Sequence, residues 1–287
     1  EILSEHNRAA VRDIARKSIV LLENRDAVLP LSDRYKSIAV VGPLADNPAD
    51  MLGSWCAQGD GNEAVGILQG IRQAVGDGVK IRYAKGCDVE GEDRSGFSEA
   101  VRAVKKSDVA IVCLGETRFM SGEAASRTRL SLPGVQRELL ARLEATGTPV
   151  VLLLTNGRPL VLDWEQKHIS TILECWQLGS EAGHAIADVL FGKYNPSGKL
   201  TLSFPHNEGQ IPVYYNSKST GRPYVPDEWY VTRYQDCPNT PLYPFGYGLS
   251  YTRFEYGEPT ADKECIAPDE TLRVAVTVTE SSVCGKE

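Results

Sequence analysis

The chain has 287 residues, of which 42 % are hydrophobic and 24 % charged, and its formal net charge is -7. This composition is typical of a globular protein with a sizeable core. An acidic chain gains nothing from a polyphosphate partner, so we expect no nucleic-acid binding. The longest apolar stretch, from Pro149, stops at Asn156 and is too short to span a membrane, and no basic run suggests a membrane surface.

Segments of helical and strand character alternate along the first two thirds of the chain. Apolar residues at helical spacing predict an amphipathic helix over residues 3–22. Short apolar runs then predict strands at 37–42, 79–84, 108–115, 149–156 and 170–176, and periodic segments predict helices at 63–75, 97–107, 133–147 and 180–192. This alternation predicts an α/β fold, with a mainly parallel sheet sandwiched by helices.

The pattern changes after Phe204. Residues 206–252 are rich in Pro, Gly and Tyr and lack periodicity, so we expect an irregular segment that wraps a neighbour. Residues 254–261 and 270–280 predict two strands, the second alternating with period two as a half-buried strand does. Two strands cannot form a stable sandwich, so we expect an incomplete β unit over 253–287. The expected division is then 1–36 as a linker helix and connection, 37–205 as the α/β domain, 206–252 and 253–287.

The sequence offers no signal for a metal or nucleotide cofactor. None of the seven cysteines lies in a CxxC or a Cys/His cluster, and no glycine-rich phosphate loop is present. We expect Cys113 and Cys175 to be buried free thiols, because both lie in apolar runs. Cys265 and Cys284 could pair.

One connection stands out as a candidate site. Ligands of a parallel sheet gather at the carboxyl ends of its strands, and residues 116–132 form a much longer connection there than a strand-to-helix turn needs. The connection holds two carboxylates, Glu116 and Glu123, and the small neighbours of Glu123 leave room for a ligand. The simpler alternative is a solvated loop with surface ion pairs. His184 is expected on a helix face, not as a catalytic base.

Several segments, in collinear order, resemble the C-terminal portion of family 3 glycoside hydrolases of the bacterial periplasmic β-glucosidase type. The most specific are SGEAASRTRLSLPGVQ (121–136), ADVLFGKYNPSGKLTLSFP (187–205) and LYPFGYGLSYTRFEY (242–256). The resemblance implies a (β/α)8 barrel, then a six-stranded α/β sandwich, then a fibronectin type III-like domain. The chain opens without an initiator Met or a signal segment, so we expect it to begin in the linker helix after a barrel and to end early in the fibronectin-like domain.

The resemblance also implies a chemistry. Such enzymes are retaining exo-glycosidases in which a barrel aspartate attacks the sugar and a glutamate of the sandwich domain serves as general acid/base. The glutamate at the motif position is Glu123, and Ser121 and Arg127 are expected to steer it, while Glu116 supports the loop. The alternative is that Glu116 is the acid and Glu123 pairs with Arg127. No cofactor is needed.

The implied function is therefore one part of a β-glucosidase active site, inactive without the nucleophile's domain. The implied partners are β-linked glucosides or oligosaccharides and the barrel. A homodimer of the full-length protein stays open, and a periplasmic or secreted location is implied. The alternatives are a related β-xylosidase or arabinofuranosidase, or a catalytically inactive carbohydrate-binding or interaction module.

Overall fold

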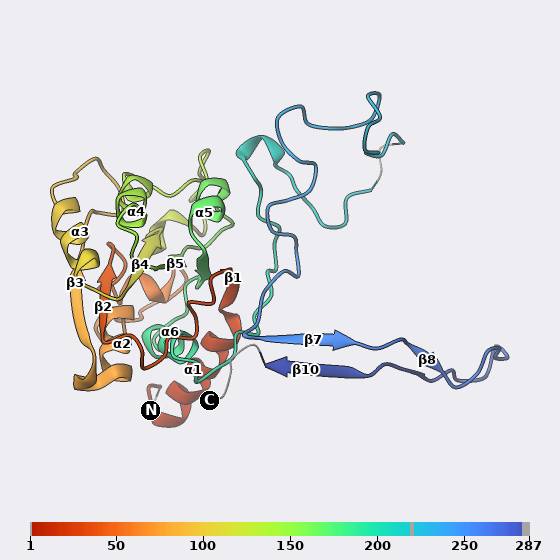
Figure 1. The fold of residues 1–287 in the computed structure, drawn as a ribbon, viewed down its shortest axis with the longest axis horizontal. Helices are drawn as coiled ribbons and strands as arrows, with labels where there is room; N and C mark the ends of the chain where they lie inside the picture. The colour runs from red at the N-terminus through yellow and green to blue at the C-terminus, as the bar shows by residue number, and fades with distance from the viewer. Residues whose placement is uncertain (1, 219–220, 283–287) are drawn as a thin grey trace. The chain divides into compact units, whose positions relative to one another are not determined.

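The computed structural model describes residues 2–218 and 221–282. The chain forms two compact units, Glu1–Leu249 and Ser250–Glu287 (Figure 1). The first unit carries the predicted α/β fold, and each unit is described by itself below.

The sheet of the first unit has six strands in the order β1-β6-β5-β4-β2-β3. All neighbouring strands pair in parallel except β1 and β6, which are antiparallel. The strands are β1 (Val20–Asn24), β2 (Ser37–Val41), β3 (Lys80–Ala84), β4 (Val109–Gly115), β5 (Val150–Thr155) and β6 (Thr171–Glu174). The predicted mainly parallel sheet is thus confirmed.

Helices cover both faces of this sheet. Figure 1 shows α3, α4 and α5 on one side and α1, α2 and α6 on the other. Every residue of β4 and β5 is buried, as strands covered on both faces require. The helices are α1 (Glu5–Ser18), α2 (Ile67–Val75), α3 (Phe97–Lys105), α4 (Gln136–Glu144), α5 (Asp163–His168) and α6 (Ala182–Leu190), and short 3-10 turns are η1 (Asp50–Leu52), η2 (Gly61–Glu63), η3 (Gly76–Gly78), η4 (Arg118–Met120) and η5 (Glu208–Gln210).

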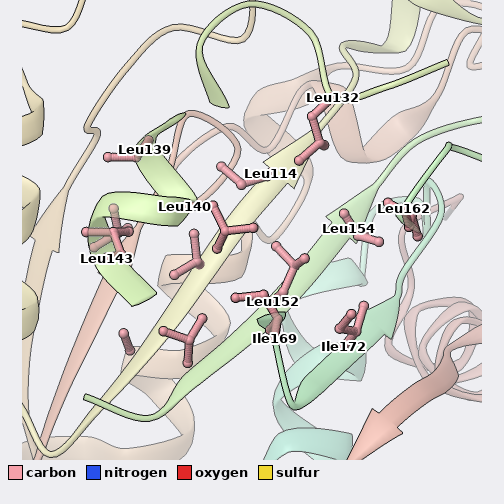
Figure 2. Close-up of a cluster of buried hydrophobic side chains, with 14 of the residues drawn as sticks. Leu114, Leu132, Leu139, Leu140, Leu143, Leu152, Leu154, Leu162, Ile169 and Ile172 are labelled. Carbon is pink, nitrogen blue, oxygen red and sulfur yellow. The ribbon is translucent and has the colours of Figure 1, made fainter. Parts of the chain in front are cut away.

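The apolar core on one face of the sheet lies under α4. Figure 2 shows Leu139, Leu140 and Leu143 of α4 beside Leu114 of β4 and Leu152 of β5, all fully buried. Leucines at helical spacing thus meet alternate residues of two neighbouring strands. The burial of this face fixes the end of β4, from which the candidate loop leaves.

The predicted helix over residues 3–22 was wrong in its last part. The helix α1 ends at Ser18, and Val20–Asn24 form the edge strand β1. The residues from Ile19 to Leu22 are completely buried, and a helix packed along one face could not bury four consecutive side chains. The short helix α5 was not predicted, because six residues are too few for a periodic signal.

The segment after the sheet is bound to the rest of the first unit at both of its ends. Phe204 and Tyr243 form an isolated antiparallel bridge, and Leu249 pairs with Leu21 of β1. Between them, the described residues contain the turn η5 and no strand or longer helix. An irregular segment was predicted here; that it wraps a neighbour stays a prediction.

Residues 250–282, the described part of the second unit, contain four short strands instead of the two predicted. The strands β7 (Thr252–Tyr256) and β10 (Val278–Ser282) pair with each other, as do β8 (Thr260–Ala261) and β9 (Val274–Ala275). The side chains of Val274 and Val278 are 64 % and 50 % exposed, so the expected half-buried strand is not formed in this chain. A fibronectin type III-like identity of this unit stays a prediction.

The structure confirms the predicted state of the two core cysteines. Cys113 and Cys175 are buried and free, and burial raises the pKa of each thiol well above its usual value. Cys265 is exposed and free, while Cys284 lies outside the described residues.

Two glycines allow α2 and α6 to approach closely. A Cβ atom on Gly70 of α2 would lie 2.1 Å from the carbonyl oxygen of Gly183 in α6. Because that contact is with backbone, neither helix can relieve it by moving a side chain. At this point the two helices therefore meet backbone against backbone.

We expect Gly70→Ala to destabilise the first unit by about 1–3 kcal/mol through overpacking. Without the close crossing, the same change inside a helix would stabilise by about 0.5–1 kcal/mol. The free energy of unfolding in urea tests this. Gly78→Ala is the matched control, since a Cβ there meets nothing within 4 Å. An equal or higher stability of Gly70→Ala would contradict the close crossing.

The last residue of β6 is a buried carboxyl group. The side chain of Glu174 is inaccessible to solvent, and it accepts hydrogen bonds from the Trp176 amide (2.9 Å) and from Asn156 Nδ2 (3.1 Å). Burial, assisted by the charge of Glu116, raises the pKa of Glu174 to about 8. The folded protein therefore holds this proton at neutral pH.

We expect the stability of the chain to fall as the pH rises from 5 to 8, in part because of Glu174. Its folded pKa lies above the ordinary value of 4.5, so its contribution is complete below pH 4.5 and is lost as the pH passes 8. The slope is at most about 1.4 kcal/mol per pH unit. Thermal unfolding of Glu174→Gln should depend less on pH than that of the wild type, whereas the exposed-site control Glu144→Gln should keep the wild-type slope. Identical slopes for all three would refute the assignment.

Candidate functional site

The carboxyl ends of β4, β5 and β6 meet at one edge of the sheet, and residues 116–132 extend from it. A buried side-chain amide fixes the origin of this loop. Gln136, at the start of α4, accepts a hydrogen bond from the Gly115 amide and donates one to the Gly115 carbonyl, both at 2.8 Å. It also donates to Val89 O at 2.9 Å. One amide thus satisfies both backbone groups of the last residue of β4.

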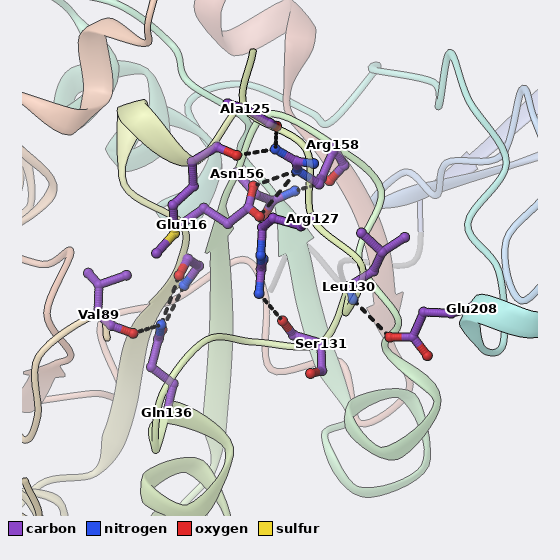
Figure 3. Close-up of polar contacts among 12 residues, drawn as sticks. Val89, Glu116, Ala125, Arg127, Leu130, Ser131, Gln136, Asn156, Arg158 and Glu208 are labelled. Atoms are coloured by element: carbon purple, nitrogen blue, oxygen red, sulfur yellow. Dashed lines mark hydrogen bonds and ion pairs between the residues drawn. The ribbon is translucent and has the colours of Figure 1, made fainter. Parts of the chain in front are cut away.

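Glu116 lies at the base of the loop as a completely buried carboxylate. Two arginines neutralise it: Arg127 donates from Nη1, and Arg158 Nε lies 3.3 Å from the nearer carboxylate oxygen (Figure 3). The side chains of Arg127 and Arg158 are only 21 % and 19 % exposed. A buried charge needs such partners. That Glu116 supports the loop stays a prediction.

The two arginines also bind the backbone of the loop. Arg127 donates from Nη2 to Ser131 O at 3.1 Å, near the end of the loop. Arg158, which follows β5, donates from Nη2 to Met120 O and, at 2.8 Å, to Ala125 O. The same guanidinium groups that neutralise Glu116 therefore hold three loop carbonyls.

The far end of the loop is fastened to the segment after the sheet. The Leu130 amide donates to Glu208 Oε1 at 2.8 Å, and this hydrogen bond holds the pKa of Glu208 below its usual value. The Leu130 carbonyl accepts from the Val161 amide, also at 2.8 Å. The loop is therefore fixed at its base, on both sides of its tip (at Met120 and Ala125) and at its end.

Glu123 lies at the exposed tip of this loop. Its neighbours have left-handed backbone angles, with φ of +106° at Gly122 and +59° at Ala124. Within the described residues the carboxylate of Glu123 makes no hydrogen bond or ion pair, and its side chain is exposed. A carboxyl group in this setting is available to a ligand or to another domain.

The other two predicted site residues do not contact Glu123. Ser121 is buried, and its Oγ fills the space where a Cβ of Gly157 would lie, at 2.0 Å. Arg127 binds Glu116 instead. A direct steering role for either residue stays a prediction, and the geometry shows only that both help to shape the loop.

A second loop lies beside the tip, and residue patterns alone did not single it out. A Cβ on Gly122 would lie 2.5 Å from Ser54 Oγ and 3.6 Å from Trp55 Nε1. Trp55 is 73 % exposed. Buried Asp50 links the two loops by accepting a hydrogen bond from the Arg118 amide at 2.9 Å. The GSW sequence at 53–55 was the only signal for this neighbour.

Two negative findings concern the described part of the chain. No group of three or more His, Cys, Asp or Glu side chains is placed to hold a metal ion among residues 2–218 and 221–282. In the same residues, no helix combines the length and apolarity needed to cross a membrane.

His184 lies on α6, as expected. Its Nδ1 is 2.6 Å from Glu181 Oε2, and its Nε2 is 2.6 Å from Gln73 Oε1.

Sequence comparison finds relatives that cover nearly the whole chain. It is 47 % identical to the periplasmic beta-glucosidase of Salmonella typhimurium over 97 % of this chain and 39 % of that protein. It is 41 % identical to a beta-xylosidase of Formosa agariphila over 99 % of this chain and 39 % of that protein. The chain thus spans about two fifths of the length of these relatives.

Structure comparison agrees. The crystal structure of a beta-glucosidase from Listeria innocua in complex with isofagomine superimposes with a TM-score of 0.90 at 38 % identity, covering 98 % of this chain and 39 % of that one. The model of the glycosyl hydrolase family 3 C-terminal domain matches residues 19–251. This match spans more than half of the chain, so the chain belongs to glycosyl hydrolase family 3, as its C-terminal domain.

Proposed function

We propose that this chain supplies the general acid/base, Glu123, to a retaining exo-acting β-glucosidase whose nucleophile lies in another domain. The observation that carries the proposal is the exposed carboxyl group of Glu123, which no other residue among 2–218 and 221–282 pairs with, at the tip of a loop fastened to the carboxyl edge of the sheet. Ligands of parallel sheets bind at this edge. A group that must reach a sugar held by a second domain has to project in this way.

The alternative acid, Glu116, is poorly suited to the role. It is completely buried and is paired with Arg127 and Arg158. Its two carboxylate oxygens face arginine nitrogens in a place closed to solvent, so Glu116 is not placed to reach a glycosidic oxygen. The alternative also required Glu123 to pair with Arg127, whereas Arg127 binds Glu116 in the structure.

The mechanism has two displacements. In the first, a carboxylate of the other domain attacks the anomeric carbon, and Glu123 gives its proton to the departing glycosidic oxygen. In the second, Glu123 takes a proton from water as the water oxygen displaces the enzyme carboxylate. The sugar leaves with its original configuration, and Glu123 regains its proton. The two carboxyl groups must lie about 5–5.5 Å apart for this sequence.

Terminal β-glucosides are the proposed substrates, since the named relatives include beta-glucosidases from two organisms. A β-xylosidase is the second candidate, because the Formosa agariphila relative is nearly as similar. The exposed indole of Trp55 beside the tip of the loop offers a face on which a sugar ring could stack. By analogy with the Salmonella typhimurium relative, we propose a periplasmic location.

The proposed partner of this chain is a (β/α)8 barrel that brings the nucleophile. The partial coverage of the relatives supports this, because more than half of each lies outside the match. The competing proposal is an inactive carbohydrate-binding module. It predicts that Glu123 can be replaced without changing any rate of hydrolysis.

We expect Glu123→Ala, in the complete polypeptide that contains this chain, to slow hydrolysis of β-glucosides with poor leaving groups by about 10²–10⁴-fold. Dinitrophenyl β-glucoside should be cleaved at nearly the wild-type first-step rate, because its leaving group needs little protonation. Added azide should restore turnover and yield glucosyl azide, since it attacks without help from a base. Steady-state kinetics and product analysis measure both effects.

Two control variants accompany this test. Glu144→Ala removes an exposed carboxyl group at the end of α4 and should leave all rates unchanged. Glu116→Ala should give no azide product, because the carboxylate of Glu123 remains. If azide instead rescues Glu116→Ala and not Glu123→Ala, then Glu116 is the acid.

We also expect the purified 287-residue chain to be inactive. It holds the proposed acid but not the attacking group, and a general acid alone does not supply a nucleophile. Nitrophenyl β-glucoside should therefore be released no faster than in a buffer blank. Turnover that survives repeated purification, and is lost in Glu123→Ala, would mean that the nucleophile lies in this chain.

A further inference from the structure

We propose that Arg158 is a positioning residue that holds Glu123 in place, with Glu116 as the buried counter-charge that holds Arg158. The inference rests on the proposed role of Glu123 and adds the residue that sets its position. Arg158 lies after β5, outside the loop that it contacts, so it can connect that loop to the rigid sheet.

The contacts of Arg158 bracket Glu123. Nη2 donates to the carbonyl of Met120, three residues before Glu123, and to that of Ala125, two residues after it (Figure 3). One planar guanidinium group therefore binds the backbone on both sides of the tip. Arg127, in contrast, donates to a different loop carbonyl, that of Ser131 near the end of the loop. The two arginines share Glu116 but hold different parts of the backbone.

The backbone of the tip needs these hydrogen bonds from Arg158 to keep its conformation. Ala124 has a φ of +59°, a left-handed conformation that costs an L-residue roughly 1–2 kcal/mol. The tip has few bonds of its own: Ala125 N donates to Gly122 O at 3.3 Å, and Met120 N donates to Thr117 O at 3.1 Å. A non-glycine residue in such a left-handed conformation persists only when its surroundings hold it.

Arg158 is itself anchored on two sides. Its carbonyl accepts a hydrogen bond from Asn156 Nδ2 at 2.8 Å, and the same nitrogen donates to Glu174 Oε2 at 3.1 Å. Its Nε faces the buried carboxylate of Glu116. Anchored in this way, the guanidinium group is pre-organised. It therefore loses little side-chain entropy for each hydrogen bond that it forms.

Removing Arg158 leaves Glu116 paired with Arg127, so the domain is expected to fold. Lysine keeps the positive charge but has no planar fork to reach both carbonyls and Glu116 together. Arg158→Gln and Arg158→Lys therefore separate the geometry from the charge. Arg129→Gln is the matched control, because Arg129 is exposed in the same loop and no hydrogen bond or ion pair joins it to another described residue.

Amide hydrogen exchange of the 287-residue chain tests whether Arg158 holds the tip of the loop, and this measurement needs no catalytic activity. In Arg158→Gln and Arg158→Lys the amides of Met120 and Ala125 should exchange at least tenfold faster, while those of β4 and α4 keep their wild-type rates. Arg129→Gln should match the wild type throughout. Unchanged exchange at the tip in both Arg158 variants would overturn the proposal.

Kinetics of the complete polypeptide test the consequence. A displaced acid should lower kcat/KM for poor leaving groups by about 10- to 100-fold in Arg158→Gln and leave dinitrophenyl β-glucoside nearly unaffected. Azide should give no product, because the carboxylate of Glu123 is still present. If Glu123→Ala lacks the leaving-group signature, the proposed function fails. If it shows the signature and Arg158→Gln does not, only the positioning role fails.

Discussion

The carboxylate of Glu116 lies out of reach of water between two guanidinium groups, and the arrangement of the loops around it follows from the need to keep it paired. Removing a charge from water costs several kcal/mol unless partners with good geometry replace the hydration. Arg127 comes from the loop itself and Arg158 from the next strand end, so neutralising Glu116 brings these two segments together. Burial raises the pKa of a second carboxyl group nearby, Glu174, to about 8, so Glu174 adds little negative charge beside Glu116 at neutral pH.

The loop thus combines a fixed base with an open tip. Gln136 holds the origin of the loop, Arg158 holds the backbone on both sides of its tip, and Glu208 holds its end. Glu123, at the tip, is exposed. Catalytic groups work best when fixed by supporting contacts and free of competing partners. The polar groups beneath the tip provide the fixation, and the residues on either side of Glu123 have left-handed backbone angles.

The sequence predicted most of the fold and only part of the site. Buried strands such as β4 and β5 could be predicted from the sequence, because their side chains are apolar on both faces over six or seven residues. The strand β1 was assigned to the preceding helix, since its apolar residues continue the pattern of that helix without a break. Glu123 was found from loop length and family resemblance. The role of Arg158 was not, because its contacts with Met120 and Ala125 span more than thirty residues, and no local pattern reports such a contact.

The proposed division of the site between two domains would place a particular demand on the one described here. A retaining mechanism requires two carboxyl groups that keep a separation near 5 Å, and a misplacement of about 1 Å can cost a hundredfold in rate. Docking of the proposed second domain would fix the position of this domain as a whole, but it could not correct a loose loop at no cost, because ordering that loop would draw on the energy of association. Rigidity built into the chain beforehand avoids this cost. The buried pairing of Glu116 with Arg127 and Arg158 provides it, since breaking that pairing would leave a charge without water or partner.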